Sequence, residues 1–138
     1  MHLQVTKHML QTLYSDGLLV GRQSLAKLRP DGFVSVDASM AGELITKPFL
    51  WPDDDAVSLY INADASWGEV YCELIDSSAG SPFARFWVPA HLPPPFVGDS
   101  TKHRVEWGAD ADIAEVRGKV VAVKFYLHQA SLFSFWLE

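Results

Sequence analysis

Three tyrosines stand among polar residues in segments where apolar and polar side chains alternate. The segments are Val57-Ser58-Leu59-Tyr60-Ile61-Asn62, Glu69-Val70-Tyr71-Cys72-Glu73 and Val123-Lys124-Phe125-Tyr126-Leu127-His128. In a strand the apolar residues point to one side, so each tyrosine is expected on the other, polar side. A phenol ring beside hydrogen-bonding groups can stack on the apolar face of a pyranose. With one tryptophan at an expected turn, the candidate carbohydrate-binding residues are Tyr60, Asn62, Trp67, Tyr71, Tyr126 and His128.

The same residues also fit two roles that need no sugar. Tyrosine fits a half-buried strand surface, and cross-strand aromatic pairs stabilise sheets without a ligand. The polar faces could also pack against another domain or a second copy of the chain. Trp67, in Ala65-Ser66-Trp67-Gly68, could bind a ligand, anchor a partner or fold over the end of the domain.

Signals for catalysis or metal binding are weak. Gly98-Asp99-Ser100 followed by His103 is similar to a serine esterase block, but the Gly-x-Ser-x-Gly elbow is missing, so a small hydrolase is the weaker alternative. The five histidines lack metal-ligand spacing, and the single Cys72 argues against a structural zinc site. The aspartates at 53–55, 110 and 112 are more typical of turns than of calcium loops. The sequence therefore predicts no catalytic residue, metal or cofactor.

Glycine and proline divide the chain into short segments with a period of two, which predicts an all-β protein. The expected strands are Gly17–Leu28, Gly32–Ala38, Gly42–Phe49, Ala56–Asp64, Gly68–Asp76, Lys102–Gly108, Val120–Gln129 and Ser131–Leu137. Only Asp112–Val116 and Thr6–Tyr14 suggest helical turns, and the second could equally be an extended strand. The four prolines within Pro89–Pro95 predict a stiff surface loop.

About eight short antiparallel strands in a chain of 138 residues favour a two-sheet β-sandwich with a jelly-roll-like topology. No repeat or linker divides the chain, so residues 1–138 are expected to form a single domain. Its size allows a self-sufficient core, and eight Phe, five Trp and four Tyr exceed what that core requires. Some of these aromatic rings are therefore expected at the surface of the protein.

Charge and hydropathy exclude two classes of partner. With 11 Lys and Arg against 17 Asp and Glu, the formal net charge is −6, which argues against nucleic acid. No apolar run is long enough for a membrane helix, and the first residues lack the pattern of a signal peptide, so no membrane partner is expected. The single cysteine leaves the compartment open.

A series of short blocks resembles the C-terminal β-sandwich that follows a five-bladed propeller in proteins similar to glycosyl hydrolase family 32. The blocks run in order from Gly21 to Phe135: Leu25 to Ala38, Gly42 to Phe49, Leu59 to Ala65, Gly68-Glu69-Val70, Leu74-Ile75-Asp76, Gly98-Asp99-Ser100 with His103, Val105 and Trp107-Gly108, Val123-Lys124-Phe125, and Leu132 to Phe135. The Pro89–Pro95 loop and Trp51-Pro52-Asp53 have no counterpart in this pattern.

The resemblance implies an accessory domain without catalytic activity. In proteins of this type the catalytic acids belong to the propeller, and the sandwich packs on the propeller or binds carbohydrate. Residues 1–24 would then connect to an upstream propeller. We therefore expect a non-catalytic carbohydrate-binding or glycoside-hydrolase accessory module, with an oligosaccharide as its ligand. The alternative is a structural or protein-interaction domain that packs on a propeller or self-associates.

Overall fold

The computed structural model describes residues 4–9, 22–83, 94–107 and 112–138. The chain separates into two compact units, Met1–Phe33 and Val34–Glu138. In the first unit, β1 (Gln4–Met9) pairs antiparallel with β2 (Arg22–Lys27). Of the two alternatives for Thr6–Tyr14, a helical turn or an extended strand, the strand is confirmed for Thr6–Met9, because these residues pair with β2 in a regular ladder. Residues 10–14 lie outside the described part of the chain.

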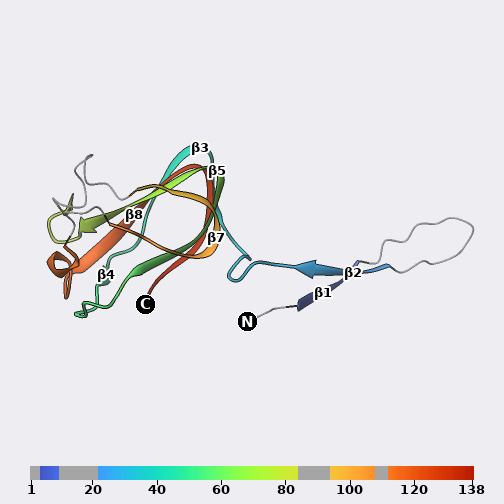
Figure 1. Ribbon diagram of the computed structural model, residues 1–138, viewed down its shortest axis with the longest axis horizontal. Coiled ribbons are helices and arrows are strands. Elements are labelled where there is room, and N and C mark those ends of the chain that lie inside the picture. Colours follow the sequence, from blue (N-terminus) through green and yellow to red (C-terminus); the bar gives the residue numbers. More distant parts are fainter. Residues whose placement is uncertain (1–3, 10–21, 84–93, 108–111) are drawn as a thin grey trace, which may run out of the picture. The chain divides into compact units, whose positions relative to one another are not determined.

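The second unit is built on one sheet of antiparallel strands, which confirms the all-β prediction (Figure 1). The strand order is β3-β8-β5-β6, with β4 paired to β8 and β7 paired to β5. The strands are β3 (Val36–Ile45), β4 (Phe49–Leu50), β5 (Leu59–Asp76), β6 (Ser81–Pro82), β7 (Phe96–Arg104) and β8 (Val120–Leu137). The two longest strands, β5 and β8, are neighbours and form the centre of the sheet.

Three predicted breaks between strands are wrong, because in each case the chain continues as one bent strand. β3 contains the end of the predicted strand Gly32–Ala38 and the first half of Gly42–Phe49, and the predicted strand pairs at 56–76 and 120–137 are halves of β5 and β8. The register shifts between Ala38 and Ala41 in β3, and between Asp64 and Glu69 in β5. Figure 1 shows β5, β7 and β8 curving together at this line. We call it the bend.

The bend keeps one face of the sheet buried along both halves of each long strand. On β5 the buried residues fall at Leu59, Ile61 and Ala63, and then at Val70, Cys72 and Leu74, so the parity changes across the bend. The predicted inner residues of β8, at positions 121, 123, 125 and 127, are also buried. We call this buried face the inner face and the opposite one the outer face. The bulge residues inserted at the bend cause the change of parity.

The core lies between the two halves of the bent sheet. Phe125 on the first half of β8 contacts Phe135 on the second half, with ring centroids 5.4 Å apart. Trp51 is completely buried, and its ring stacks with that of Phe49 with centroids 6.5 Å apart. The single Cys72 belongs to this core, and burial raises the pKa of its thiol above the ordinary value. The thiol is therefore held as an unreactive apolar group.

Two further predictions concern the part of the chain between β6 and β8. The strand predicted at Lys102–Gly108 is displaced: β7 is Phe96–Arg104, because its backbone pairs with β5 from Val70 through Tyr60. The helical turn predicted at Asp112–Val116 is confirmed as a 3₁₀ turn, η1 (Ile113–Glu115), where the Asp112 carboxylate accepts a hydrogen bond from the Ala114 amide at 2.9 Å. Asp54 accepts one from the Ala56 amide at 2.8 Å, so both aspartates act as turn formers.

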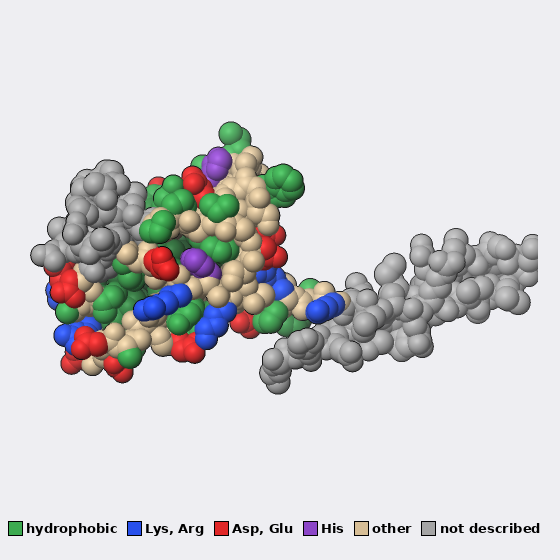
Figure 2. All heavy atoms as spheres, viewed as in Figure 1, with side chains coloured by type: hydrophobic (Ala, Val, Ile, Leu, Met, Phe, Trp, Pro, Cys, Tyr) green, Lys and Arg blue, Asp and Glu red, His purple; other side chains and the backbone are tan. Residues whose placement is uncertain are grey.

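The visible surface mixes side-chain types. Figure 2 shows acidic, basic and hydrophobic side chains interspersed on one face of the molecule. Over the described residues, no helix has the length and hydropathy needed to cross a membrane.

Candidate functional site

The six predicted binding residues fall in three places. Tyr60 and Asn62 lie on the half of β5 before the bend, and Trp67 lies within the bend itself. Tyr71, Tyr126 and His128 lie on the other half of the sheet. The structure therefore does not bring all six into one surface.

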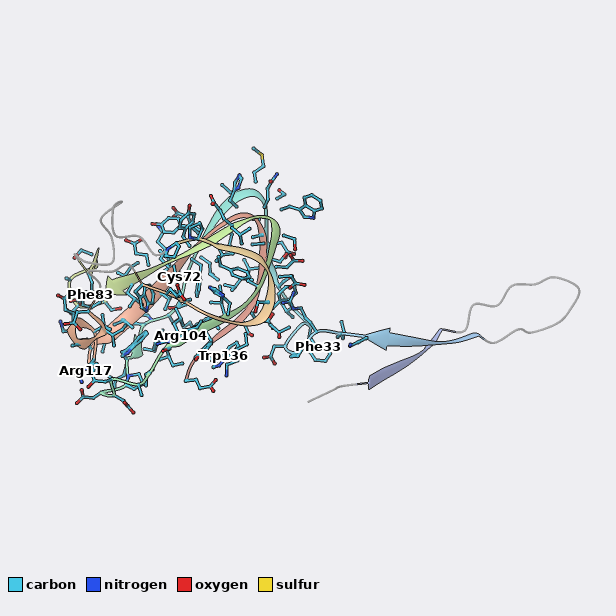
Figure 3. The ribbon with its side chains drawn as sticks, viewed as in Figure 1. Phe33, Cys72, Phe83, Arg104, Arg117 and Trp136 are labelled. Carbon is cyan, nitrogen blue, oxygen red and sulfur yellow. The ribbon has the colours of Figure 1, made fainter. Side chains whose placement is uncertain are left out.

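The Tyr60 ring is engaged by the protein on both sides. β5 lies between β8 and β7, and the cross-strand neighbours of Tyr60 are Trp136 and Arg104, both labelled in Figure 3. The Trp136 ring stacks on Tyr60 with centroids 5.8 Å apart and an angle of 14° between the planes. From the β7 side, Lys102 Nζ lies 4.8 Å from the ring centroid. The Tyr60 ring is therefore partly buried and already in contact with two side chains of the protein.

Asn62 is also withdrawn from solvent. Its side chain is 1% exposed, although the alternation predicted a solvent-facing position. A side chain this deeply buried cannot contact a ligand without a rearrangement of the sheet. Tyr60 and Asn62 therefore serve the structure of the outer face.

Tyr71, Tyr126 and His128 do come together on the outer face of the second half of the sheet. Tyr71 lies opposite Tyr126, and Glu69 lies opposite His128. The Tyr71 hydroxyl donates to Glu69 Oε2 at 3.2 Å, and the Tyr126 hydroxyl donates to Glu73 Oε2 at 2.7 Å. Burial, followed by these carboxylates, raises the pKa of both tyrosines, so both hydroxyls remain donors at neutral pH.

This tyrosine pair is closely tied to charged neighbours. Lys124 Nζ lies 4.4 Å from the Tyr126 ring centroid and forms an ion pair with Glu43 at 3.1 Å. Glu73 is 2% exposed, and its Oε1 has no hydrogen-bond partner. The Tyr126 hydroxyl is therefore the donor that stabilises a buried carboxylate. Of these three predicted residues, only His128 is exposed, and Tyr71 and Tyr126 are half-buried.

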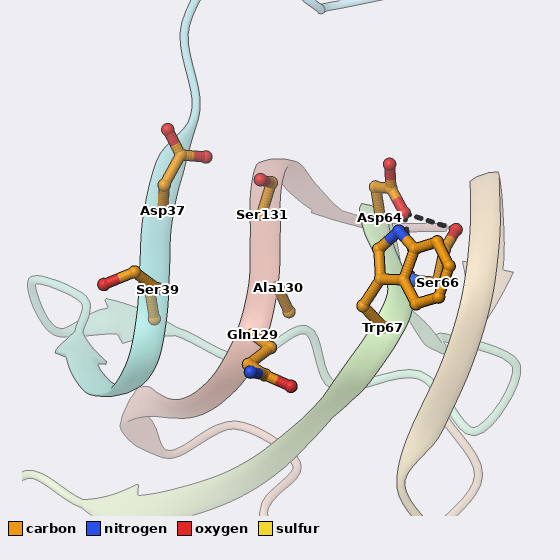
Figure 4. Close-up of a pocket in the computed structure, with 9 residues that line it drawn as sticks. Asp37, Ser39, Asp64, Ser66, Trp67, Gln129, Ala130 and Ser131 are labelled. Atoms are coloured by element: carbon orange, nitrogen blue, oxygen red, sulfur yellow. Dashed lines mark hydrogen bonds between the residues drawn. The ribbon is translucent and has the colours of Figure 1, made fainter.

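Trp67 has a different environment. It is 88% exposed and lines a groove of about 380 Å³ at the bend. The groove is lined by Asp37, Ala38 and Ser39 of β3, Gln129, Ala130 and Ser131 of β8, and Asp64, Ser66 and Trp67 of β5. In Figure 4 the β8 residues lie between Asp37 and Ser39 on one side and Trp67 and Ser66 on the other. An aromatic ring thus stands at one wall of a groove whose other lining residues are mostly polar.

Local backbone geometry accounts for the exposure of Trp67. The register between β5 and β8 passes from Asp64–Ser131 directly to Glu69–His128, so Trp67 belongs to an unpaired stretch. A Cβ atom on the next residue, Gly68, would lie 1.7 Å from the His128 carbonyl oxygen. Only glycine permits this close approach of the two strands. On β8, Gln129 has a positive φ of 44° at the same line.

Hydrogen bonds fix the polar groups of the groove. Asp64 Oδ1 accepts from the Ser66 amide at 3.0 Å and from the Ser66 hydroxyl at 2.7 Å. Side-chain hydrogen bonds from Ser131, and then from Ser35, lower the pKa of Asp37 below its ordinary value. Asp37 therefore stays ionised at neutral pH. The groove presents an exposed ring, two oriented carboxylates, hydroxyls and one amide.

Of these groove residues the sequence predicted only Trp67 as a binding residue. Asp37, Asp64, Gln129 and Ser131 come from three strands and meet through the cross-strand register, which a single strand pattern does not contain. The signal that could have located them is the concentration of polar residues on either side of each predicted turn. These breaks coincide in space because they are one bend.

The residues of the weaker hydrolase hypothesis all lie on β7. Ser100 is opposite Ala63 and His103 is opposite Ile61. The His103 ring packs on Phe96, with centroids 4.4 Å apart, and partial burial lowers its pKa. Within the described ranges, no three His, Cys, Asp or Glu side chains gather in a way that could hold a metal ion.

Comparison with known proteins gives no match to a family model, a curated protein or a solved structure.

Proposed function

We propose that this chain is a non-catalytic carbohydrate-binding module, and that its binding site is the groove at the bend. The observation that carries the proposal is the Trp67 ring, 88% exposed at the wall of a groove that also presents oriented hydrogen-bonding groups. A large apolar ring in water is costly unless a ligand or partner covers it. The polar side chains beside it favour a hydroxyl-rich ligand.

Binding would combine two contacts. The apolar face of a pyranose stacks on the Trp67 indole, and sugar hydroxyls donate to Asp37 and Asp64 and exchange hydrogen bonds with Gln129. The groove volume of about 380 Å³ lies at the small end of ligand sites, so affinity is weak. Tyr71, Tyr126 and His128 form a second, adjacent surface that a longer oligosaccharide would reach.

The proposal extends to the architecture. We propose that the two halves of the bent sheet act as the two layers of a jelly-roll-like β-sandwich, which the Phe125–Phe135 contact across the core supports. Such a module fits the resemblance to the accessory sandwich of family 32-like glycosyl hydrolases. The catalytic acids would then reside in a propeller, and this chain would bind substrate for it.

Titration calorimetry with a panel of neutral oligosaccharides tests the proposal. Binding by the wild-type chain, and its loss in Trp67→Ala, are expected, because that substitution removes the stacking surface. Leu50→Ala removes another exposed apolar side chain, outside the groove, and should bind like the wild type. If no sugar binds, or if Trp67→Ala binds as tightly as the wild type, the groove is not a carbohydrate site.

A second function, docking on a propeller or on a second copy, is favoured by other exposed apolar residues. Met40 on β3 is 76% exposed, and Val34 and Val97 are also exposed. Sedimentation over a range of protein concentrations tests self-association. A dimer that dissociates in Met40→Asp but not in Leu50→Asp would favour the interface. A monomer at every concentration would remove the second copy from consideration.

A further inference from the structure

The charge of the groove indicates which class of sugar it would bind. The described residues that line it include the carboxylates Asp37 and Asp64 and no cationic side chain. Asp99 of β7 lies directly opposite Asp64 in the strand register. The chain as a whole carries a formal net charge of −6. A ligand that enters this groove therefore meets a negative potential.

The position of Asp37 makes its charge available to a ligand. Its hydrogen-bond partners, Ser131 and Ser35, are both neutral hydroxyls that orient the carboxylate without cancelling its charge. Asp37 and Ser131 face each other across β3 and β8 on the groove side, and both line the groove. Asp64 Oδ1 accepts hydrogen bonds from the Ser66 amide and hydroxyl.

Trp67 adds a second group that favours a cation. The face of an indole attracts an ammonium group through its quadrupole, and indole is the strongest of the aromatic side chains in this respect. A ring and carboxylates around one groove form a site for a ligand that has both an apolar ring face and a positive charge. Sugars with carboxylates or sulfates would instead be repelled by Asp37 and Asp64.

We propose that the groove selects amino sugars, in which a protonated amine lies between the Trp67 ring and the Asp37 and Asp64 carboxylates. This inference rests on the proposed function, because it assigns a ligand class to the same groove. The stacking on Trp67 supplies binding to any pyranose, and the carboxylates supply the preference for a cationic one.

Three hexasaccharides with the same β-1,4-linked glucose backbone test the preference. They differ only at carbon 2 of each ring, which carries a hydroxyl, an N-acetylamino group or a free amine. Calorimetry at about pH 6 keeps the amines protonated, since simple amines titrate near or above neutrality. We expect the free-amine hexamer to bind about threefold to tenfold more tightly than the other two, as partly exposed charge contacts allow. Salt of about 0.5 M screens the charges and should reduce the ratio of the affinity for the free-amine hexamer to that for the other two.

Matched variants separate a local effect from the net charge. Asp37→Asn and Asp64→Asn each retain a hydrogen-bonding oxygen but lose the charge. We expect each variant to reduce the ratio of free-amine to hydroxyl hexamer affinity toward one, and this ratio within each variant is the readout, since both residues also accept from sugar hydroxyls and the affinity for the hydroxyl hexamer can fall as well. Asp53→Asn changes the net charge equally at an exposed position outside the groove and should leave the ratio unchanged.

Each result has a distinct meaning. Equal affinity of the wild type for all three hexamers would overturn the amino-sugar inference and leave the carbohydrate function standing. If the affinity ratio fell as much in Asp53→Asn as in Asp37→Asn and Asp64→Asn, the inference would also be overturned, because the preference for the amine would then come from net charge. Failure of every hexamer to bind would overturn both proposals.

Discussion

Tyr60 and Trp67 lie on the same strand and were singled out by similar reasoning, yet their environments are opposite. The Tyr60 ring contacts both Trp136 and Lys102, whereas Trp67 is the most exposed large apolar residue described. The difference comes from the neighbouring strands. Tyr60 has a ladder partner on both sides, and Trp67 lies where the ladder between β5 and β8 is interrupted. Where the ladder is regular, side chains of the neighbouring strands contact the Tyr60 ring. Where the bulge interrupts the ladder, the Trp67 ring is exposed to solvent.

The largest expected effect comes from a substitution at the bend itself. Gly68→Ala would place a Cβ atom 1.7 Å from a backbone oxygen of β8, and neither backbone can move without breaking the register. We expect a loss of about 3 kcal/mol or more in the free energy of unfolding, measured in urea. Gly80→Ala is the control. Gly80 has a φ of +66° but open space around its Cβ position, so its cost is about 1 kcal/mol. Equal losses in the two variants would contradict the close approach.

The two tryptophans provide the next test. Trp136→Ala removes the ring stacked on Tyr60 and the donor to Glu138, and should destabilise the protein by about 2 kcal/mol. Trp67→Ala removes an exposed ring and should change the free energy of unfolding by less than about 0.5 kcal/mol. Urea unfolding of both variants measures the difference. If Trp67→Ala were the more destabilising of the two, the ring would be structural.

The two tyrosines on the outer face donate to carboxylates that differ in burial: Tyr126 to the buried Glu73, and Tyr71 to the half-buried Glu69. Tyr126→Phe leaves the buried Glu73 carboxylate without its donor and should cost about 1.5 kcal/mol. Tyr71→Phe removes a donor to the more accessible Glu69 and should cost less than about 0.5 kcal/mol. The same unfolding measurement compares them. A reversed order would show that Glu73 finds another donor.

The smallest expected effect concerns His103, on β7 opposite the core residue Ile61. Burial lowers its pKa in the folded state, so the unfolded chain binds a proton at higher pH than the folded one. Stability is therefore complete above about pH 6.5 and falls as the pH drops through the ordinary histidine range. Urea titrations at about pH 7.5 and pH 5.5 should show this loss, and His103→Gln should reduce it. The same loss in both proteins would assign the effect to other groups.

The sequence predicted the inner faces of β5 and β8 because alternation alone determines which side chains are buried together. It did not predict that Ala65–Gly68 continues one strand, since a Gly-containing polar break has the same local signature in a hairpin turn and in a bulge. The distinction depends on the partner strand: both sides of the break in β5 pair with β8. For the same reason Asp37 and Ser131 were not predicted beside Trp67, because their proximity is created by the register of three strands.

The pairing of β5 with β8 also determines how the domain can fold. Leu59 pairs with Leu137, and the Ser58 and Glu138 backbones exchange hydrogen bonds of 2.8 and 3.0 Å, so the central ladder joins segments far apart in the chain. Contacts of such long range must overcome a large loop-closure entropy before they contribute stability, which makes folding slow, on the scale of milliseconds to seconds. The first half of β5 has no central partner until residues 131–138 have left the ribosome. Until then this half of β5 has an unpaired edge on its β8 side, and transiently exposed edges and apolar surface make folding intermediates prone to aggregation.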